Sequence, residues 1–284
     1  MSDHRPPLRC PVCSEPLQWE SQASKTIRCA LNHTFDQAKQ GYWNLLLPQR
    51  KRSKSPGDNQ AMVDARHQFL SLGHYQPIVN AIQNTLTNLY SHLDTPSLID
   101  LGCGEGYYTR QIYQAMPSDS KPVTCIGLDI SKPAILHASK LDKQITWLVA
   151  TGADIPVMAS SIDIATLIFA RLLPEPTAKI LKPGGYFLVV WPGPDHLREL
   201  RELIYTEVRD SDLNPDAQLS DLFEPIQCDR LGFRFTLNDE HDINHLLMMT
   251  PHGQRLHATA RSRLLSQSQL TLQADIRLSL YRKR

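Results

Sequence analysis

The sequence of 284 residues has no long apolar run and no excess of charge of one sign. Its longest apolar stretches, 165–170 and 186–191, are far shorter than the ~20 residues that cross a bilayer, so we expect no membrane-spanning helix. The first residues also lack the apolar core of a secretory signal, which favours a cytoplasmic protein. Six cysteines are too few, in a chain this long, for the disulfide framework of a small secreted domain.

The near-zero net charge hides an uneven distribution. Lysine and arginine total 30 and aspartate and glutamate 29, which gives +1 and by itself does not indicate a nucleic-acid partner. Residues 1–58, however, contain nine basic and five acidic residues, a net charge of +4. Hydrophobic residues make up 41% of the chain and charged residues 21%, as in ordinary globular proteins. The length therefore predicts one large domain with a smaller basic unit attached to it.

Four potential metal ligands lie close together near the N-terminus. Cys10, Cys13, Cys29 and His33 follow the spacing C-x2-C-x15-C-x3-H. Zinc prefers four such ligands in a tetrahedron, and a segment this short cannot build a core without help. Because the protein fills all four positions, we predict a structural Zn²⁺ and a zinc-binding RNA-recognition module over residues 1–47. Four unrelated residues, or a site that only stabilises the fold, are the alternatives.

A basic segment bounded by proline and glycine follows the predicted module. Residues 48–58 contain Arg50, Lys51, Arg52 and Lys54 and end at Pro-Gly-Asp, so we expect a basic linker. These four cations are candidate RNA-binding residues that contact phosphates. A short run of charge is more often only solvated, and the sequence leaves both interpretations open.

From residue 59 to the end the pattern predicts one α/β domain. Residues 59–93 have helical periodicity broken at Gly73 and Pro77. Strands and helices then alternate, which is typical of a mostly parallel sheet with helices on both faces, as in Rossmann-like folds. The expected strands cover 98–101, 123–128, 145–150, 162–169 and 186–191, and a helix is expected over 107–116. Segments near 233–236 and 270–280 are expected to form the last antiparallel strands.

The loop after the first of these strands carries the candidate cofactor site. Gly102, Gly104 and Gly106 allow the backbone to approach a ligand at the carboxyl edge of the sheet, and Cys103 and Glu105 lie between them. Asp100 precedes the loop, where a carboxylate suits a cofactor with a positively charged amino group. Asp129 ends the second strand and is placed to bind ribose hydroxyls. A dinucleotide fingerprint would need glycine or alanine at position 107, which is tyrosine, so S-adenosyl-L-methionine is the expected cofactor.

Together with the Lys-Pro-Gly-Gly turn at 182–185, this pattern resembles class I S-adenosylmethionine-dependent methyltransferases. The fold class that follows is a Rossmann-like class I methyltransferase sheet over residues 59–284, with the small zinc module before it. Asp154, after the third strand, is similar in position to the segment that contacts adenine in that fold. It suits a helix cap equally well.

Zinc ligands followed by this domain resemble the ribosomal RNA large-subunit methyltransferase A family over nearly the whole chain. The resemblance rests on the zinc ligands, on 35–46, 51–58, 69–77, 100–109 and 127–132, and on Pro192-Gly-Pro-Asp-His196-Leu. It implies methylation of N1 of a guanine in the hairpin 35 loop of 23S rRNA. It also implies that Tyr75 and His196 help to hold the cofactor, although from the residues alone Tyr75 suits a core position and His196 a capping or solvated one.

The sequence leaves two questions open: which guanine is methylated, and which residue acts as the general base. Residues 169–174 depart from the family pattern where substrate-facing residues are expected, so a resistance-type sibling that methylates the neighbouring guanine remains an alternative. A small-molecule methyltransferase and a non-catalytic RNA-binding scaffold are more distant alternatives. Guanine N1 carries a proton, so a general base is needed. No residue is assigned to that role, because Asp163 and Glu175 are the only carboxylates near the fourth strand and Asp163 suits a structural role.

RNA loops are recognised by stacking and phosphate contacts, and Tyr42 and Trp43 are the candidate stacking residues beside the cations of 50–54. Packing is the alternative for Trp43. The expected partner is therefore 23S rRNA and no membrane. A homodimer is a further expectation.

Overall fold

The structure is a computed structural model that describes residues 5–284 except 22–23, 52, 117–122, 206, 209–213, 251–252, 254–255 and 257. Arg52, one of the expected RNA-binding cations, lies outside the described residues. Within the described ranges, no helix has both the length and the apolar composition that a membrane crossing requires.

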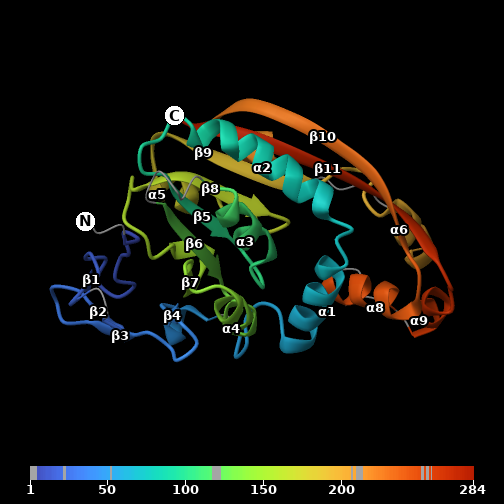
Figure 1. Ribbon diagram of the computed structural model, residues 1–284, viewed down its shortest axis with the longest axis horizontal. Coiled ribbons are helices and arrows are strands. Elements are labelled where there is room, and N and C mark those ends of the chain that lie inside the picture. Colours follow the sequence, from blue (N-terminus) through green and yellow to red (C-terminus); the bar gives the residue numbers. More distant parts are fainter. Residues whose placement is uncertain are drawn as a thin grey trace.

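An eight-stranded sheet forms the centre of the molecule (Figure 1). Its order is β10 (Phe223–Leu237), β11 (Leu270–Lys283), β9 (Leu181–Pro192), β8 (Ile162–Ile168), β5 (Ser97–Leu101), β6 (Thr124–Asp129), β7 (Thr146–Val149) and β4 (Tyr42–Asn44). The strands from β9 to β4 are parallel, and β11 is antiparallel to both of its neighbours. This order and the positions of the strands confirm the predicted α/β class.

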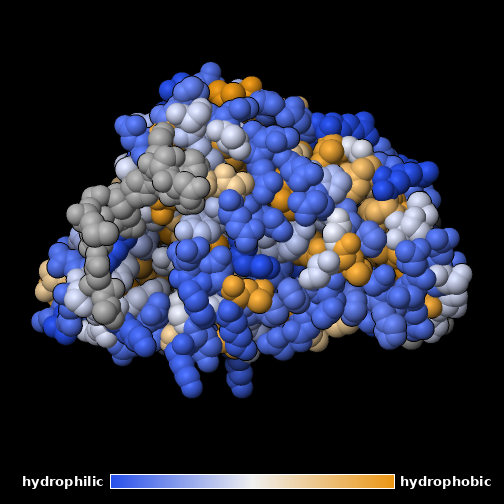
Figure 2. Space-filling view, viewed as in Figure 1, coloured by the Kyte–Doolittle hydropathy of each residue, from blue (hydrophilic) through white to orange (hydrophobic). Residues whose placement is uncertain are grey.

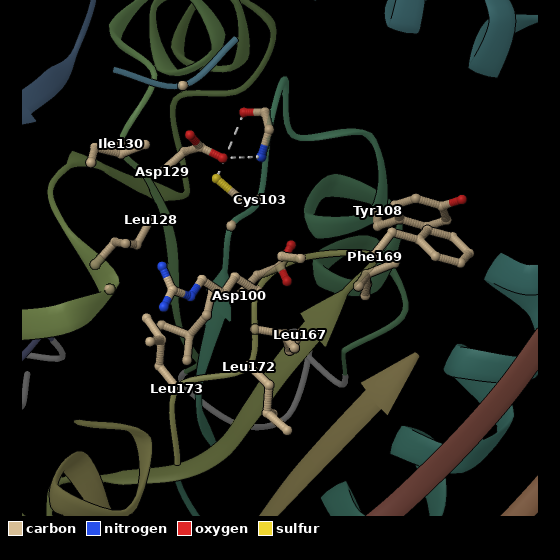
Figure 3. Close-up of a pocket in the computed structure, with 18 of the residues that line it drawn as sticks. Asp100, Cys103, Tyr108, Leu128, Asp129, Ile130, Leu167, Phe169, Leu172 and Leu173 are labelled. Atoms are coloured by element: carbon tan, nitrogen blue, oxygen red, sulfur yellow. Dashed lines mark hydrogen bonds between the residues drawn. The ribbon is translucent and has the colours of Figure 1, made fainter. Parts of the chain in front are cut away.

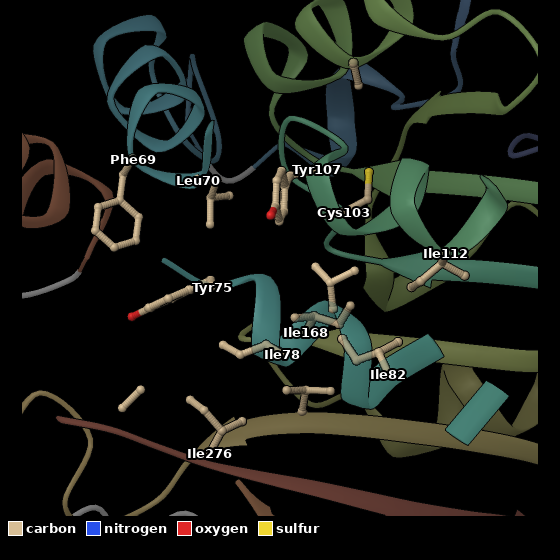
Figure 4. Close-up of a cluster of buried hydrophobic side chains, with 14 of the residues drawn as sticks. Phe69, Leu70, Tyr75, Ile78, Ile82, Cys103, Tyr107, Ile112, Ile168 and Ile276 are labelled. Atoms are coloured by element: carbon tan, nitrogen blue, oxygen red, sulfur yellow. The ribbon is translucent and has the colours of Figure 1, made fainter. Parts of the chain in front are cut away.

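Two apolar cores lie on opposite faces of this sheet, because successive residues of a strand point in opposite directions. In β8, Ile164 belongs to one core and Ala165 to the other. The first core packs against α2 (Gln76–Tyr90), α3 (Tyr107–Gln114) and α4 (Lys132–Leu141), and Figure 4 shows its side chains between α2 and the sheet. The second core packs against α5 (Pro174–Ile180) and α7 (Pro215–Leu219). Helices therefore cover both faces, as predicted.

A second group of helices lies beyond one end of the sheet. The strands β10 and β11 run on past the other strands, and α6 (Arg198–Ile204), α8 (Glu240–Met249) and α9 (Ala258–Leu265) gather at their far end (Figure 1). There α8 packs against α1 (Gln60–Ser71), which follows the basic linker. The surface in Figure 2 is largely hydrophilic, with apolar residues in scattered groups.

The N-terminal module has its own antiparallel sheet of β1 (Gln18–Trp19), β2 (Thr26–Arg28) and β3 (Thr34–Asp36). It packs on the second apolar core, with Leu8 and Ile27 fully buried and Leu8 bridged to Val157. The large sheet starts inside the range expected for this module, because β4 pairs in parallel with β7. A three-residue edge strand has too weak a pattern to be recognised in the sequence.

The position of β4 also changes the roles of two aromatic residues. Tyr42 is 5% exposed and Trp43 3% exposed, and the Trp43 ring meets Trp19 edge to face at 6.4 Å. The structure therefore contradicts the expectation that these rings stack on RNA. They fix the module to the edge of the large sheet instead.

One buried tryptophan supports the loop that carries the candidate cofactor residues. Trp147 of β7 is fully buried, and its ring fills the space beside Gly106 and Gly127. A Cβ atom on Gly127 would lie 2.3 Å from the Trp147 ring, and one on Gly106 would lie 2.6 Å from it. Glycine is therefore required at both positions for the loop and β6 to pack this closely.

Candidate active site and zinc centre

A cavity of about 1190 Å³ lies where the parallel strands β5, β6, β8 and β9 end (Figure 3). The chain order reverses between β5 and β8, which is the place where open α/β sheets bind their ligands. The lining includes every residue predicted to hold the cofactor except Gly106: Tyr75, Asp100, Gly102, Cys103, Gly104, Glu105, Asp129, Asp154 and His196. The volume exceeds the ~300–1,000 Å³ of ordinary small-molecule sites, so a cofactor and part of a second ligand fit together.

The glycine loop turns sharply and is closed by Asp129. Gly102, Gly104 and Gly106 all have positive φ angles, from +57° to +82°, which other residues rarely adopt. The backbone N–H of Gly104 donates to Asp129 Oδ2 at 2.9 Å, and that of Ser131 donates to Oδ1 at 2.7 Å. Each carboxylate oxygen retains a lone pair, so Asp129 can still accept from the hydroxyls of a bound ribose.

Asp100 is held beneath the loop by two threonines. Its side chain is 1% exposed, and it accepts hydrogen bonds from Thr109 Oγ1 at 2.5 Å and Thr166 Oγ1 at 2.8 Å. Burial raises the pKa of Asp100 to about 6 and also raises the pKa of Asp129. Two carboxylates buried together favour a ligand that carries positive charge, which S-adenosylmethionine does through its ammonium and sulfonium groups.

Aromatic side chains line the opposite end of the cavity. The hydroxyls of Tyr75 and Tyr108 are buried and have no hydrogen-bond partner in the described part of the chain, so a ligand can supply one. The His196 ring lies 6.3 Å from Tyr75 and 6.1 Å from Phe169, the latter with planes only 14° apart. Tyr75 is thus both a buried core residue, as an aromatic residue type suggested, and part of the cavity wall.

Phe169 is a site residue that the sequence did not single out. It follows β8, has a φ of +53° and keeps 38% of its surface exposed beside Tyr108 (Figure 3). A phenylalanine in the left-handed region is strained, and such strain concentrates at functional sites. The only signal in the sequence was that 169–174 departs from the family pattern.

Asp154 links the N-terminal module to the cavity. It forms ion pairs with Arg9 of the module and Arg50 of the linker. The alternative that Asp154 caps a helix is wrong, because Thr151 accepts the capping hydrogen bond of the short 3-10 helix Gly152–Asp154. Arg50 is therefore engaged with this carboxylate, whereas Lys51 and Lys54 are exposed.

The end of the expected linker is part of the cavity wall. Gly57 has a φ of +80°, and a Cβ atom there would lie 2.8 Å from the Ser131 side chain. Asp58 accepts from Arg66 of α1, and its backbone carbonyl accepts from Ser131 Oγ at 2.6 Å. Residues 57 and 58 thus close the cavity over Asp129 rather than only connecting two domains.

The four predicted zinc ligands converge. One ligand atom from each of Cys10, Cys13, Cys29 and His33 lies within 4.8 Å of the others. The Sγ atoms of Cys13 and Cys29 are 3.6 Å apart, and Cys29 Sγ is 3.4 Å from His33 Nδ1. Tetrahedral zinc with ordinary bond lengths would give about 3.8 Å between two sulfurs and about 3.6 Å between sulfur and nitrogen. The donor set and its spacing therefore fit a structural Zn²⁺.

Two carboxylates considered for proton transfer lie elsewhere. Asp163 accepts from the Ser97 backbone and hydroxyl and from Lys182 Nζ, so it has the structural role that its position suggested. Glu175 is exposed at the start of α5 and does not line the cavity.

The raised pKa of Asp100 predicts a specific pH dependence of stability in the cofactor-free protein. An unfolded Asp titrates near ~3.9, so the folded state holds this proton more tightly and loses stability as Asp100 ionises. Between about pH 4 and about pH 7, the free energy of unfolding should fall by up to ~3 kcal/mol relative to Asp100→Asn, which cannot ionise. Urea unfolding of both proteins across this range measures the difference, and parallel pH profiles would contradict it.

Comparison with known proteins agrees with both parts of the structure. Residues 8–54 match the zinc-ribbon family described as "RlmA, N-terminal", and residues 98–185 match the family described as "Methyltransferase domain".

Three relatives extend the similarity to most of the chain. The "23S rRNA (guanine(748)-N(1))-methyltransferase" of Streptomyces fradiae is 34% identical over 86% of this chain and 84% of its own length. A Micromonospora griseorubida protein, provisionally named 23S rRNA (guanine-N(1)-)-methyltransferase, is 30% identical over 99% of this chain and 98% of its own. A Bacillus subtilis protein with the same provisional name, YxjB, is 29% identical over 86% of each chain. The zinc ribbon, the cavity and these relatives show that this chain belongs to the 23S rRNA (guanine-N1)-methyltransferase family.

Proposed function

We propose that this protein transfers a methyl group from S-adenosylmethionine to N1 of a guanine in the hairpin 35 loop of 23S rRNA. The observation that carries the proposal is the pair of ion pairs that Asp154 forms with Arg9 and Arg50. They connect the zinc ribbon and the basic linker directly to the wall of a methyltransferase cavity. A methyltransferase for small molecules would need neither of these attachments. A non-catalytic scaffold would not need the complete set of glycines and carboxylates at the sheet edge.

The residues of the sheet edge hold and orient the cofactor. Asp129 would accept from the ribose hydroxyls, and Asp100 would face the ammonium end across the glycine loop. When bound, S-adenosylmethionine supplies an electrophilic methyl group, and the protein contributes alignment and electrostatic stabilisation. Tyr75 and Tyr108 would offer their buried hydroxyls to the ligand at the far end.

The aromatic end of the cavity suits the target base. N1 lies on the Watson–Crick edge of guanine, so the base must leave any pair before it can react. An unstacked base is commonly held against aromatic rings. Phe169 is exposed at the cavity mouth, and its ring lies nearly parallel to that of His196. We assign Phe169 as the residue on which the target guanine stacks.

The RNA would cross the surface between the linker and the cavity mouth. Lys51, Lys54 and Arg171 are exposed, so they can contact phosphates. Arg50 would act with Asp154 to hold the linker in place, and Arg52 remains a predicted contact outside the described residues. An rRNA substrate agrees with the expected cytoplasmic location. The expected homodimer stays a prediction.

Methylation of 23S rRNA that lacks hairpin 35 modification tests the proposal directly. The purified protein and labelled S-adenosylmethionine should incorporate one methyl group, and primer extension should stop at one guanine of hairpin 35, because N1 methylation blocks base pairing. The position of the stop also distinguishes the target guanine from its neighbour. Incorporation without a stop in hairpin 35, or none into any rRNA, would contradict the proposal.

Replacing Phe169 by alanine should impair the RNA reaction and leave the cofactor site intact. Stacking on an aromatic side chain contributes ~1–3 kcal/mol per base, so kcat/KM for the RNA should fall by ~5- to 150-fold. The Kd of S-adenosylmethionine, measured by calorimetry, should stay within about twofold of the native value. Phe169→Trp should restore most of the rate, and Ile226→Ala, at an exposed position of β10, serves as the control. An unchanged kcat/KM in Phe169→Ala would show that the base stacks elsewhere.

A further inference from the structure

A second group of metal-ligating side chains lies beside the cofactor loop. His67 of α1, Glu105 of the glycine loop and His137 of α4 each place one ligand atom within 4.8 Å of the others. The Nδ1 atom of His67 is 3.6 Å from Glu105 Oε2, and the two imidazole rings have centroids 4.5 Å apart. None of these residues belongs to the zinc ribbon, and the three come from separate elements of the chain.

Several polar atoms of this group are buried without a hydrogen-bond partner in the described part of the chain. The Glu105 side chain is 1% exposed, and neither of its carboxylate oxygens has a hydrogen-bond partner in the described structure. The same holds for Nδ1 of His67 and Nε2 of His137. Burying a carboxylate without a hydrogen-bond donor is unfavourable, so native proteins rarely leave one in this state.

Two arginines lie near this carboxylate, but neither forms a hydrogen bond with it. Arg110 Nη2 lies 4.0 Å from Glu105 Oε2, which is beyond hydrogen-bond distance, and Arg66 is engaged with Asp58. A divalent ion would satisfy the carboxylate and both nitrogens at once.

We propose that His67, Glu105 and His137 bind a second divalent metal ion, Zn²⁺ or an ion with similar ligand preferences. Two imidazoles and a carboxylate are a common ligand set for zinc, with a fourth position left for water. Nitrogen and oxygen ligands around tetrahedral zinc lie about 3.3 Å apart. The 3.6 Å between His67 Nδ1 and Glu105 Oε2 is close to this value, and rotation of the His137 side chain would bring its ligand nitrogen nearer to both atoms. The ion joins α1, α4 and the glycine loop, and it thereby fixes the loop that carries Gly104 and Gly106.

The zinc content of the full-length protein tests this site without relying on the proposed methylation. After equilibration with excess Zn²⁺ and removal of loosely bound ion, elemental analysis should find two zinc ions per native chain. His137→Gln and His67→Asn should each retain one, because the ribbon is unchanged. Cys13→Ser should also retain one, from the histidine site. His92→Gln, at an exposed position at the end of α2, should retain two.

Circular dichroism and the urea midpoint confirm that each variant is folded before its zinc is counted. One zinc per native chain at every Zn²⁺ concentration would overturn the proposal. Two zinc ions in both His137→Gln and His67→Asn would overturn it as well, because the second ion would then lie elsewhere. Glu105→Gln keeps the shape of the side chain and removes its charge, and it should weaken the second site at least tenfold in a chelator competition while the ribbon ion stays bound.

Discussion

The site depends on the hydrogen bonds that the Asp129 carboxylate accepts from the backbone of Gly104 and Ser131. A chain that leaves β5 and enters α3 in a few residues must expose backbone N–H groups, and three glycines with positive φ make the turn possible. Asp129 satisfies the N–H of Gly104 and that of Ser131, and so fastens the turn to the end of the neighbouring strand. The Trp147 ring packs against Gly106 and Gly127 and so restricts movement of the glycine loop. The cofactor site is therefore preorganised by one carboxylate and one ring.

The zinc ribbon is part of the same rigid construction. Leu8 and Ile27 are buried in the core that also contains strands of the large sheet, and β4 extends that sheet. Gly57 and Asp58 then form a wall of the cavity. Removing residues 1–58 would therefore damage the methyltransferase domain itself, and the activity of such a deletion cannot separate RNA recognition from catalysis. Single substitutions on the surface are the informative changes.

Much of this architecture is predictable from the sequence because the signals are local. Short apolar runs predict the strands. The glycines between Asp100 and Asp129 predict the cofactor loop, and the spacing of the cysteines predicts the zinc ligands. The role of Asp154 was not predictable, because its partners Arg9 and Arg50 are more than a hundred residues away in the chain. Phe169 was missed for a related reason: its importance comes from its φ angle and from His196, and neither has a signature in the surrounding sequence.

The most direct test of this account is the affinity of Asp129→Ala for S-adenosylmethionine, measured by titration calorimetry on the full-length protein. Hydrogen bonds to a charged group contribute ~1.5–3 kcal/mol each, so loss of the ribose contacts should weaken binding at least ~10-fold. Asp221→Ala, at an exposed site away from the cavity, should bind as tightly as the native protein. The predicted result is one-to-one binding that is at least ~10-fold weaker in Asp129→Ala than in the native protein. Equal affinity in all three proteins would contradict the placement of the cofactor at this edge of the sheet.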